Sequence, residues 1–486
     1  MQFAGRFWVD GRRIMGCYTT ELDRACMEQA SQTGLFSRLR KRFAAMRRVE
    51  SPEAGTAAGD QALAERLLAR QPYIAPTRSR ARVVHLIGSL SAGGAERQLV
   101  YLARESMRGA TVEPRILVIN PLEGAARHYL PLAEQGGVAV DVAGEVLDRT
   151  VARNLERDGE LRRLLLAIDP RYRGWCVDLA AEFVRMQPDI VHAWLDHANI
   201  WGGIAALAAG VPHVVLSTRN VNPSNFPKID APYFLPWYRR LAQSPRVSFI
   251  GNSRVGAADY ADWIGIPRAR VQVVLNGFDP AETRRPAETE LARLRTSLGL
   301  DNKRVVLGIF RIAEEKQPLD FAAAAEEILA AVPDAVVIVA GDGPMREELA
   351  ARAAAIAKDR FVLLGRREDV AALASIADLL LHASRKEGSP NAVVEAQALG
   401  CPVVATRGGG TIDAVEHNGS GFLCDVGDTR ALAAHAVEIL RDDSLRLRLS
   451  ARAPKFVDER FGLGRMVEES LACYPPRRDH AIGSTR

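Results

Sequence analysis

Residues 382–406 read HASRKEGSPNAVVEAQALGCPVVAT and have the pattern of a strand end, a helix and a second strand. An apolar run ends at Ser384, and a second apolar, β-branched run begins at Pro402. Between them, Ser389-Pro390 is typical of a helix N-cap followed by a proline in the first turn. A strand, a helix and another strand in this order predict one unit of a parallel sheet that is covered on both faces.

The same alternation fills most of the chain in two series, which a charged segment without strand character separates at residues 280–303. Because apolar strands alternate with amphipathic helices in each series, the sequence predicts an α/β fold with two doubly wound domains. The expected strands are residues 82–88, 115–120, 189–194, 213–218, 247–252 and 271–276 in the first series, and 305–310, 335–341, 361–365, 379–384 and 402–407 in the second.

The composition excludes several classes of protein. The 486 residues include 64 Lys and Arg against 59 Asp and Glu, and this small excess gives no support for nucleic acid as a partner. The composition is that of a globular protein rather than a fibrous or disordered one. The chain has no apolar run of about 18 residues and its start lacks a signal-peptide core, so we expect a cytoplasmic protein. The six cysteines show no CxxC pair, which argues against a zinc site or a disulfide framework.

Residues 1–81 differ from the rest. Six basic residues and no acid occur in residues 37–48, and apolar side chains recur beside them at helical spacing. This pattern predicts a basic amphipathic helix over residues 35–48, which either touches an anionic membrane surface, making the protein peripheral, or packs as a solvated helix on the body or stays poorly ordered. Residues 51–62 read as a linker. We therefore expect a mainly helical N-terminal extension over residues 1–81.

The loop and helix within residues 382–406 carry two acids. In open parallel sheets, ligands bind beyond the carboxyl ends of the strands. Glu387 lies in the expected loop, and Glu395 lies about two turns into the expected helix. Each can accept hydrogen bonds from a vicinal diol, and the helix start between them can hold a phosphate. Alternatively, a carboxylate near a helix start serves only the helix dipole.

The first strand of each series also ends in a candidate site. Gly93-Gly94 follows the strand at residues 82–88 and runs into a helix, where backbone amides can approach a phosphate; the alternative is a tight turn. Arg311 and Lys316 follow the first strand of the second series. Two cations in such a loop suit a diphosphate leaving group, unless Glu314-Glu315 neutralises them.

Polar residues end two further strands of the first series. His197 is our preferred acceptor-side candidate, and Arg219 follows the next strand. The turn at residues 341–344 (GDGP) is expected to cap a helix, and the loop at residues 365–369 (GRRED) is suited to hold a base or a ring. The chain has no Asp-x-Asp sequence, the simplest carboxylate clamp for a metal-bound diphosphate.

In this order, the motifs resemble family 4 of the retaining, nucleotide-sugar-dependent glycosyltransferases with the GT-B fold (glycosyl transferases group 1). The resemblance spans about residues 82–470 and leaves out the first 80 residues or so. It is carried by GGAER (93–97), FIGNS (249–253), VLNGFD (274–279), Arg311 with Lys316, GDGP (341–344) and EGSPNAVVEA (387–396).

The resemblance implies two Rossmann-like domains that face each other across a cleft, with acceptor binding in residues 82–290, donor binding in 291–445 and C-terminal helices in 446–486 that cross back to the first domain. Arg311 and Lys316 would hold the donor diphosphate. Glu387 would contact the transferred sugar, and Glu395 the ribose. The phosphate cradle would consist of Gly93, Gly94, Gly388, Ser389, Pro390 and Asn391.

The resemblance also implies a reaction that needs no metal and no cofactor, in which the sugar is transferred with retention and the leaving phosphate helps to deprotonate the acceptor. A UDP-sugar is the default donor, and a saccharide or lipid-linked saccharide of a cell-envelope or exopolysaccharide pathway is the expected acceptor. Many members have a histidine where this chain has Arg219, which points instead to contact with donor phosphate or an anionic acceptor. The catalytic candidates are Arg311, Lys316, Glu387, His197 and Arg219.

Two alternatives to glycosyl transfer remain at this stage. A GT-B nucleotide-sugar epimerase needs no acceptor, and a phosphorylase needs inorganic phosphate. A non-catalytic scaffold of a polysaccharide assembly complex would keep the fold without turning over a donor.

Overall fold

The computed structural model describes residues 53–145, 157–227, 229–281 and 283–475. The chain divides into two compact units. Of the described residues, the smaller unit contains 53–72, 143–145, 157–187 and 204–210, and the larger unit contains the others. The predicted basic helix at residues 35–48 lies outside the described residues and stays a prediction.

Among the described residues, the smaller unit contains the helices α4 (Ala57–Ala69), α8 (Gly159–Ala167) and α9 (Pro170–Met186), together with α10 (Asp196–Ala209) from Ile204 onward. The linker prediction for residues 51–62 is wrong from Ala57 onward, because this segment forms the first half of α4. The Thr56 hydroxyl caps the helix by accepting a hydrogen bond from the Gly59 amide at 3.0 Å. Leu63 and Leu67, one turn apart, are buried, so packing and the cap together support an alanine-rich helix.

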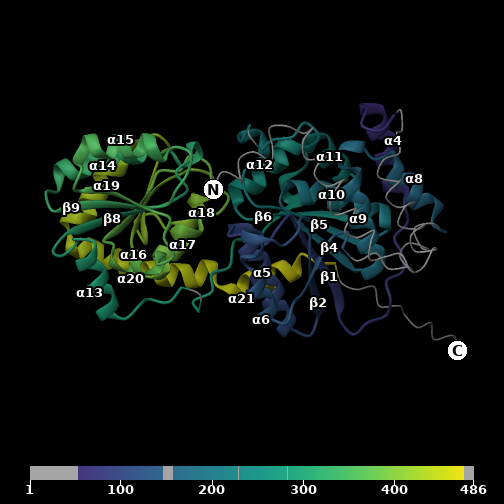
Figure 1. The fold of residues 1–486 in the computed structure, drawn as a ribbon, viewed down its shortest axis with the longest axis horizontal. Coiled ribbons are helices and arrows are strands. Elements are labelled where there is room, and N and C mark those ends of the chain that lie inside the picture. Colours follow the sequence, from purple (N-terminus) through teal and green to yellow (C-terminus); the bar gives the residue numbers. More distant parts are fainter. Residues whose placement is uncertain (1–52, 146–156, 228, 282, 476–486) are drawn as a thin grey trace, which may run out of the picture. The chain divides into compact units, whose positions relative to one another are not determined.

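The larger unit contains two parallel sheets. The first sheet has the order β3-β2-β1-β4-β5-β6-β7, and the second has the order β10-β9-β8-β11-β12-β13 (Figure 1). The strands of the first sheet are β1 (Ala81–Ile87), β2 (Val112–Val118), β3 (Ala139–Val142), β4 (Ile190–Trp194), β5 (His213–Thr218), β6 (Val247–Gly251) and β7 (Val271–Val273). Those of the second are β8 (Arg304–Ile309), β9 (Ala335–Ala340), β10 (Phe361–Gly365), β11 (Leu379–His382), β12 (Val403–Thr406) and β13 (Gly421–Cys424).

Helices connect these parallel strands. The helices that follow strands of the first sheet are α5 (Gly94–Arg108), α6 (Leu130–Gln135), α10 (Asp196–Ala209), α11 (Phe234–Leu241) and α12 (Arg254–Ile264). Those around the second sheet are α13 (Glu288–Ser297), α14 (Pro318–Ala331), α15 (Arg346–Ala357), α16 (Val370–Ile376), α17 (Asn391–Ala398), α18 (Thr411–Ala414) and α19 (Thr429–Arg441). The fold prediction of two doubly wound parallel sheets is confirmed.

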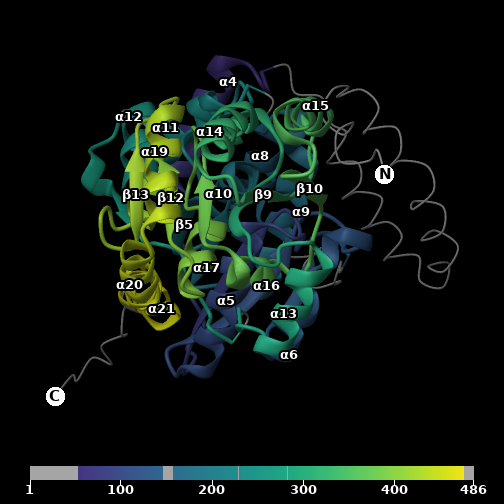
Figure 2. The same cartoon turned by 90° about the vertical axis from the view of Figure 1, so that its left-hand side faces the viewer.

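Both faces of the second sheet are buried. Successive residues of a strand point to opposite faces, so Val306 and Leu381 belong to one apolar cluster and Val305 and Leu380 to another. Helices α14 and α19 pack on the first of these faces, and α16 and α17 pack on the second (Figure 1). Figure 2 shows α19 beside β12 and β13. Continuous apolar strands are what such two-sided burial requires.

The C-terminal helices α20 (Asp443–Phe461) and α21 (Leu463–Ala472) contribute to the cores of both sheets. Leu445 and Phe461 of α20 lie in the clusters of the second sheet, whereas Met466 of α21 lies in the cluster of the first sheet. In the part of the chain that the structure describes, no helix combines the length and the apolar character that crossing a membrane requires.

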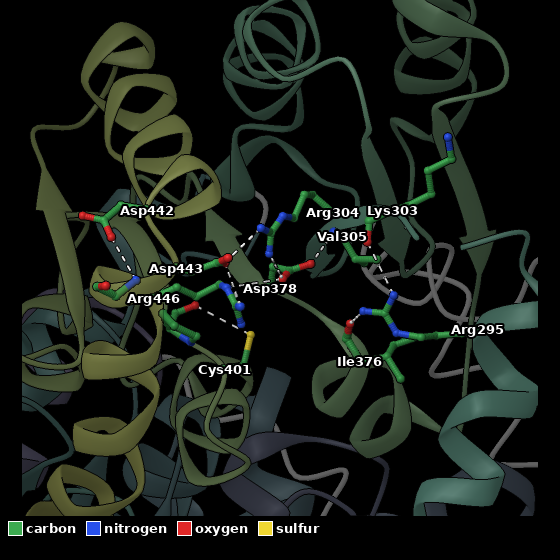
Figure 3. A network of polar contacts seen from close by, with 12 residues as sticks. Arg295, Lys303, Arg304, Val305, Ile376, Asp378, Cys401, Asp442, Asp443 and Arg446 are labelled. Atoms are coloured by element: carbon green, nitrogen blue, oxygen red, sulfur yellow. Dashed lines mark hydrogen bonds and ion pairs between the residues drawn. The ribbon is translucent and has the colours of Figure 1, made fainter. Parts of the chain in front are cut away.

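A network of charges ties together the N-terminal ends of β8 and β11 (Figure 3). Asp378 is buried just before β11, and it accepts a hydrogen bond from the Val305 amide at 2.8 Å. Its other oxygen pairs with Arg304 at 3.4 Å and with Arg446 of α20 at 3.6 Å. Asp443 contacts both guanidinium groups, at 2.9 and 3.0 Å. Because these residues lie at the end of the sheet opposite to the expected ligand edge, the network serves stability.

Candidate active site

The strand order reverses on either side of β1 in the first sheet and of β8 in the second. In doubly wound sheets, ligands bind at the switch point, where the connections that follow two neighbouring strands lead to opposite sides of the sheet. These points lie between β1 and β4, and between β8 and β11. The segments that directly follow these four strands carry Gly93-Gly94, His197, Arg311 with Lys316, and Glu387. The structure therefore places the sequence-predicted residues at the switch points of the two sheets.

Glu387 lies in the loop after β11 and is buried. Its Oε1 accepts a hydrogen bond from Lys316 Nζ at 2.6 Å and another from His382 Nε2 at 3.0 Å. Since an ionised carboxylate can only accept, the imidazole donates its Nε2 hydrogen here. Burial by itself raises the pKa of Glu387, but the charge of Lys316 and the two hydrogen bonds outweigh it and hold the pKa well below its ordinary value.

The second oxygen of Glu387, Oε2, bonds to no residue in the described part of the chain. It is the atom that can accept a hydrogen bond from a substrate hydroxyl. The suggestion that Glu314-Glu315 neutralises the nearby cations is not what the structure shows, because Lys316 pairs with Glu387 instead. Arg311 is exposed and forms no ion pair with a described residue, which leaves it able to bind an anion.

Helix α17 begins later than the sequence suggested. Its N-cap is Pro390 rather than Ser389, and the helix starts at Asn391 with no side-chain cap. Pro390 has an extended backbone (φ −77°, ψ 96°), so the proline precedes the first helical turn instead of opening it. Glu395 lies about one turn after Asn391, closer to the start of the helix than the two turns predicted. An uncapped helix start leaves backbone N–H groups free for an anionic ligand.

Glu395 forms an ion pair with Arg97 of α5. This pair lines a cavity of about 10 Å³ together with Tyr101, Asn276 and Asn391. A volume of this size holds a water molecule but no nucleoside. In this conformation, the carboxylate predicted to bind ribose is thus occupied by an arginine of the same chain.

The glycine loop after β1 approaches the start of α17 closely. Gly93 is the N-cap of α5, and Gly94 is its first residue. A Cβ on Gly94 would come within 2.8 Å of the Asn391 side chain, and a Cβ on Gly388 would come within 2.1 Å of the Arg219 carbonyl oxygen. Glycine permits this close approach at both positions. Two of the predicted phosphate-cradle residues, Gly94 and Asn391, therefore lie against each other in the structure.

His197 lies in the first turn of α10, at the end of β4. Its Nδ1 and the Tyr233 hydroxyl share a hydrogen bond of 2.7 Å, and its ring packs on Phe234 and Trp201 with centroids 4.8 and 4.9 Å apart. Burial lowers the pKa of His197 to about 4, so the imidazole is neutral near physiological pH. Leu195, two residues before it, is exposed and has a left-handed backbone (φ 73°), a conformation that non-glycine residues adopt rarely and mostly near functional sites.

Arg219 directly follows β5 and stacks on the indole ring of Trp194, with 4.7 Å between the guanidinium carbon and the ring centroid. Its Nη2 donates a hydrogen bond to Asn276 Oδ1 at 2.5 Å. Asn276 in turn donates to Asn391 Oδ1 at 2.8 Å. This relay connects the end of β5 with the start of α17.

Sequence reasoning missed three contributors to this site, namely His382, Arg97 and Asn276. Asn276 and Arg97 lie inside motifs that carried the resemblance, VLNGFD and GGAER, so the signal was present without a role. His382 is the last residue of β11, where its burial beside Glu387 depends on the loop that folds back over it.

Comparisons with known proteins bear on the family and the fold of the chain. The family profile described as "Glycosyl transferases group 1" matches residues 292–456, and the profile described as "Glycosyltransferase Family 4" matches residues 92–282. The chain is 30% identical over 416 residues to the Vi polysaccharide biosynthesis protein VipC/TviE of Salmonella typhi, a match that covers 82% of this chain and 72% of that protein.

Two further matches are informative. The UDP-Gal:alpha-D-GlcNAc-diphosphoundecaprenol alpha-1,3-galactosyltransferase of Escherichia coli is 28% identical over 291 residues, which cover 59% of this chain and 75% of the enzyme. The crystal structure of Alr3699/HepE from Anabaena, in complex with UDP and glucose, superposes with a TM-score of 0.65 at 23% identity and covers 81% of this chain and 99% of that one. At this identity, the structural match shows the fold.

With both family profiles matched in chain order and most of the Salmonella relative covered, the chain belongs to the group 1, family 4 glycosyltransferases: it is a transferase of polysaccharide or glycoconjugate synthesis with the GT-B fold.

Proposed function

We propose that the chain transfers a sugar from a UDP-sugar to a saccharide or lipid-linked saccharide acceptor, with retention of the anomeric configuration, in the synthesis of a cell-envelope or exopolysaccharide. The observation that carries the proposal is the pairing of Glu387 with Lys316 at the switch point of the second sheet. There, an ionised carboxylate with one free oxygen adjoins a primary ammonium group and the uncapped start of α17.

These groups suit the departure of a diphosphate. In the transfer, the bond between the sugar C1 and the diphosphate oxygen breaks, and the bond between C1 and the acceptor oxygen forms. Lys316 has three N–H donors, so it can keep its bond to Glu387 and still reach a diphosphate oxygen. Arg311 and the N–H groups of α17 add positive charge where negative charge develops, which is the usual way to stabilise such a transition state.

Glu387 acts in this proposal as an acceptor of hydrogen bonds rather than as an acid. Its depressed pKa keeps it ionised throughout the physiological pH range. With Oε1 already engaged by two donors, Oε2 is left for a hydroxyl of the transferred sugar. The proton of the acceptor hydroxyl goes to the leaving phosphate, so the retaining mechanism needs no protein base at this position.

The relatives support a UDP-sugar donor and a glycan acceptor. The printed name of the Escherichia coli relative gives UDP-Gal as donor and a diphosphoundecaprenol-linked sugar as acceptor, and the Anabaena protein was crystallised with UDP and glucose. We further propose that the reaction needs no metal ion, since Arg311, Lys316 and the start of α17 supply positive charge themselves. A chelator such as EDTA should then leave the rate unchanged.

Mass spectrometry of reactions with UDP-, GDP- and ADP-sugars tests the proposed function. We expect slow hydrolysis of one UDP-sugar in the absence of acceptor, and its loss in Lys316→Ala and Glu387→Ala. Lys303→Ala is the matched control, because Lys303 is exposed at the opposite end of β8. Full turnover in both site variants contradicts the proposal. NMR spectroscopy of the product then reads the anomeric configuration.

We also propose that residues 35–48 attach the protein to an anionic membrane surface. The six cations of residues 37–48 support this proposal, since basic residues near a surface each add to lipid binding. Co-sedimentation with phosphatidylglycerol vesicles should fall when Arg40 and Arg47 are replaced by Glu, and phosphatidylcholine vesicles serve as the control. Equal sedimentation of both chains excludes this segment as the anchor.

A further inference from the structure

Arg219, like Arg311, has no counter-ion among the described residues, but Arg219 is partly buried whereas Arg311 is exposed. Lys316 pairs with Glu387, and Arg97 pairs with Glu395. Among the residues that the structure describes, no carboxylate pairs with Arg219, whose hydrogen-bond partner there is the uncharged side chain of Asn276. Its Nε is buried without an acceptor, and its Nη1 also bonds to no described residue.

Among the described residues, the groups that contact Arg219 carry no negative charge. The guanidinium lies over the indole ring of Trp194. The imidazole of His192 stacks on the same indole, with 4.7 Å between the two ring centroids. His85 follows at 5.3 Å from His192. Burial lowers the pKa of both imidazoles, so they are neutral. Burial also lowers the pKa of Arg219, to about 9, and the guanidinium therefore keeps its charge at neutral pH.

A half-buried cation without a counter-ion is costly in the free protein. Taking a charged group out of water is unfavourable unless another charge or several hydrogen bonds compensate for it. The stack on Trp194 supplies part of this compensation, because a cation over an indole face is attracted by the ring. The stack also fixes the plane of the guanidinium, so its free N–H groups keep one direction, as they would in a binding site built in advance.

We propose that Arg219 binds an anionic oxygen group of a substrate, either an acidic group of the acceptor, such as a carboxylate or a phosphate ester, or the diphosphate of the donor. The proposal rests on the proposed function and adds the substrate chemistry that the first sheet recognises. Arg219 supplies N–H donors in a planar fork, the geometry that carboxylates and phosphates match. Its connection through Asn276 to Asn391 places it beside the start of α17, where both substrates would meet.

Titration calorimetry with matched pairs of probes tests the proposal without requiring turnover. The first pair is UDP and uridine, which differ in the diphosphate. The second pair, measured on the UDP-saturated protein, is methyl glucuronide and methyl glucoside, which differ in a carboxylate. The variants are Arg219→Gln and Arg219→Lys. Arg240→Gln is the control, because Arg240, in the last turn of α11, also lies over an indole ring, that of Trp237.

We expect Arg219→Gln to remove a preference of about tenfold or more for the anionic member of one pair, since a hydrogen bond to a charged group is worth that much. Loss of the glucuronide preference assigns the anion to the acceptor, and loss of the UDP preference assigns it to the donor. Arg219→Lys should keep part of the preference. If both preferences are unchanged in Arg219→Gln, the proposal is wrong.

Thermal unfolding separates this role from a structural one. Because Arg219 has no counter-ion in the free protein, Arg219→Gln should melt at the same temperature as the wild type or at a higher one. A structural arginine would lower the melting temperature when replaced, and that outcome would overturn the proposal. Because these measurements require no transfer, a protein that binds anions through Arg219 yet hydrolyses no donor would contradict only the proposed function.

Discussion

Replacing Lys316 by methionine isolates the charge on which Glu387 depends. The ammonium lies 2.6 Å from Oε1, and 8% of the Glu387 side chain is exposed. Loss of the Lys316 ammonium leaves the buried carboxylate of Glu387 with His382 as its remaining partner among the described residues. Removal of one partner from a buried ion pair costs about 3 to 5 kcal/mol. Because 22% of the Lys316 side chain is exposed, we expect a loss near the lower limit, about 3 kcal/mol at neutral pH.

The loss of unfolding free energy in Lys316→Met should depend on pH, and the pKa of Glu387 determines the direction of this dependence. In the wild type, burial raises the pKa of Glu387, and the contacts with Lys316 and His382 more than reverse that effect. A depressed carboxyl pKa contributes stability above the unfolded-state pKa, and this contribution is lost as the pH falls through the folded-state value. In Lys316→Met, His382 is the remaining group among the described residues that opposes the effect of burial, so the pKa of Glu387 rises above its wild-type value. The penalty is then largest at high pH and shrinks as the carboxylate takes up a proton.

Urea unfolding at about pH 8 and about pH 5 measures both effects. We expect Lys316→Met to lose about 3 kcal/mol at the higher pH and clearly less at the lower one. The double variant Lys316→Met/Glu387→Gln should recover most of the loss, because it carries no buried charge. Lys303→Met is the control for removal of an exposed lysine. An equal loss at both pH values, or a double variant that adds the two single losses, would refute the reasoning.

Four further outcomes test other parts of the structure. Gly388→Ala should lower the transfer rate at least tenfold because its Cβ would meet backbone at 2.1 Å, whereas Gly464→Ala, with open space around it, should not. Arg97→Gln frees the carboxylate that Arg97 now occupies and should tighten UDP binding about fivefold in calorimetry, about 1 kcal/mol; weaker binding would contradict this. His197→Phe should flatten the fall in stability between about pH 6.5 and pH 4, because the lowered pKa of His197 makes the folded protein resist protonation there. Asp378→Ala should lower the free energy of unfolding by about 3 kcal/mol and leave UDP affinity unchanged, as calorimetry can check.

The sequence predicted most strands of the two sheets, because most of them contain apolar, β-branched runs. Strands such as β8 and β11 are continuous apolar runs, and two-sided burial explains why. It missed β3 and β13. β3 is a half-exposed edge strand that contains Asp141, so it lacks the apolar run, and β13 has only four residues next to a turn. Strand β7 ends at Val273, earlier than predicted.

The sequence predicted which strand ends carry the site residues, but it did not predict which of these residues contact each other. Rules on parallel sheets place ligands beyond the carboxyl ends of strands, and this located Lys316 and Glu387 without knowledge of their distance. The bond between them joins residues 71 positions apart, and the bond from Arg97 to Glu395 joins residues 298 positions apart. Such pairings depend on how loops close over the sheet, which local spacing does not determine. The start of α17 was misplaced for a local reason, the extended backbone of Pro390.

A buried carboxylate with neighbouring cations lies at each end of the second sheet, and the two carboxylates have different roles. Asp378 and Glu387 are both buried carboxylates that neighbouring cations contact. Both oxygens of Asp378 are engaged by the protein, one by the Val305 amide and the other by arginine side chains. Glu387 has both of its donors on a single oxygen and leaves the other open. Since a fully satisfied carboxylate can only hold the fold together, whereas one with a free oxygen is completed by a ligand, this difference in hydrogen bonding separates the stabilising end of the sheet from the end that binds substrate.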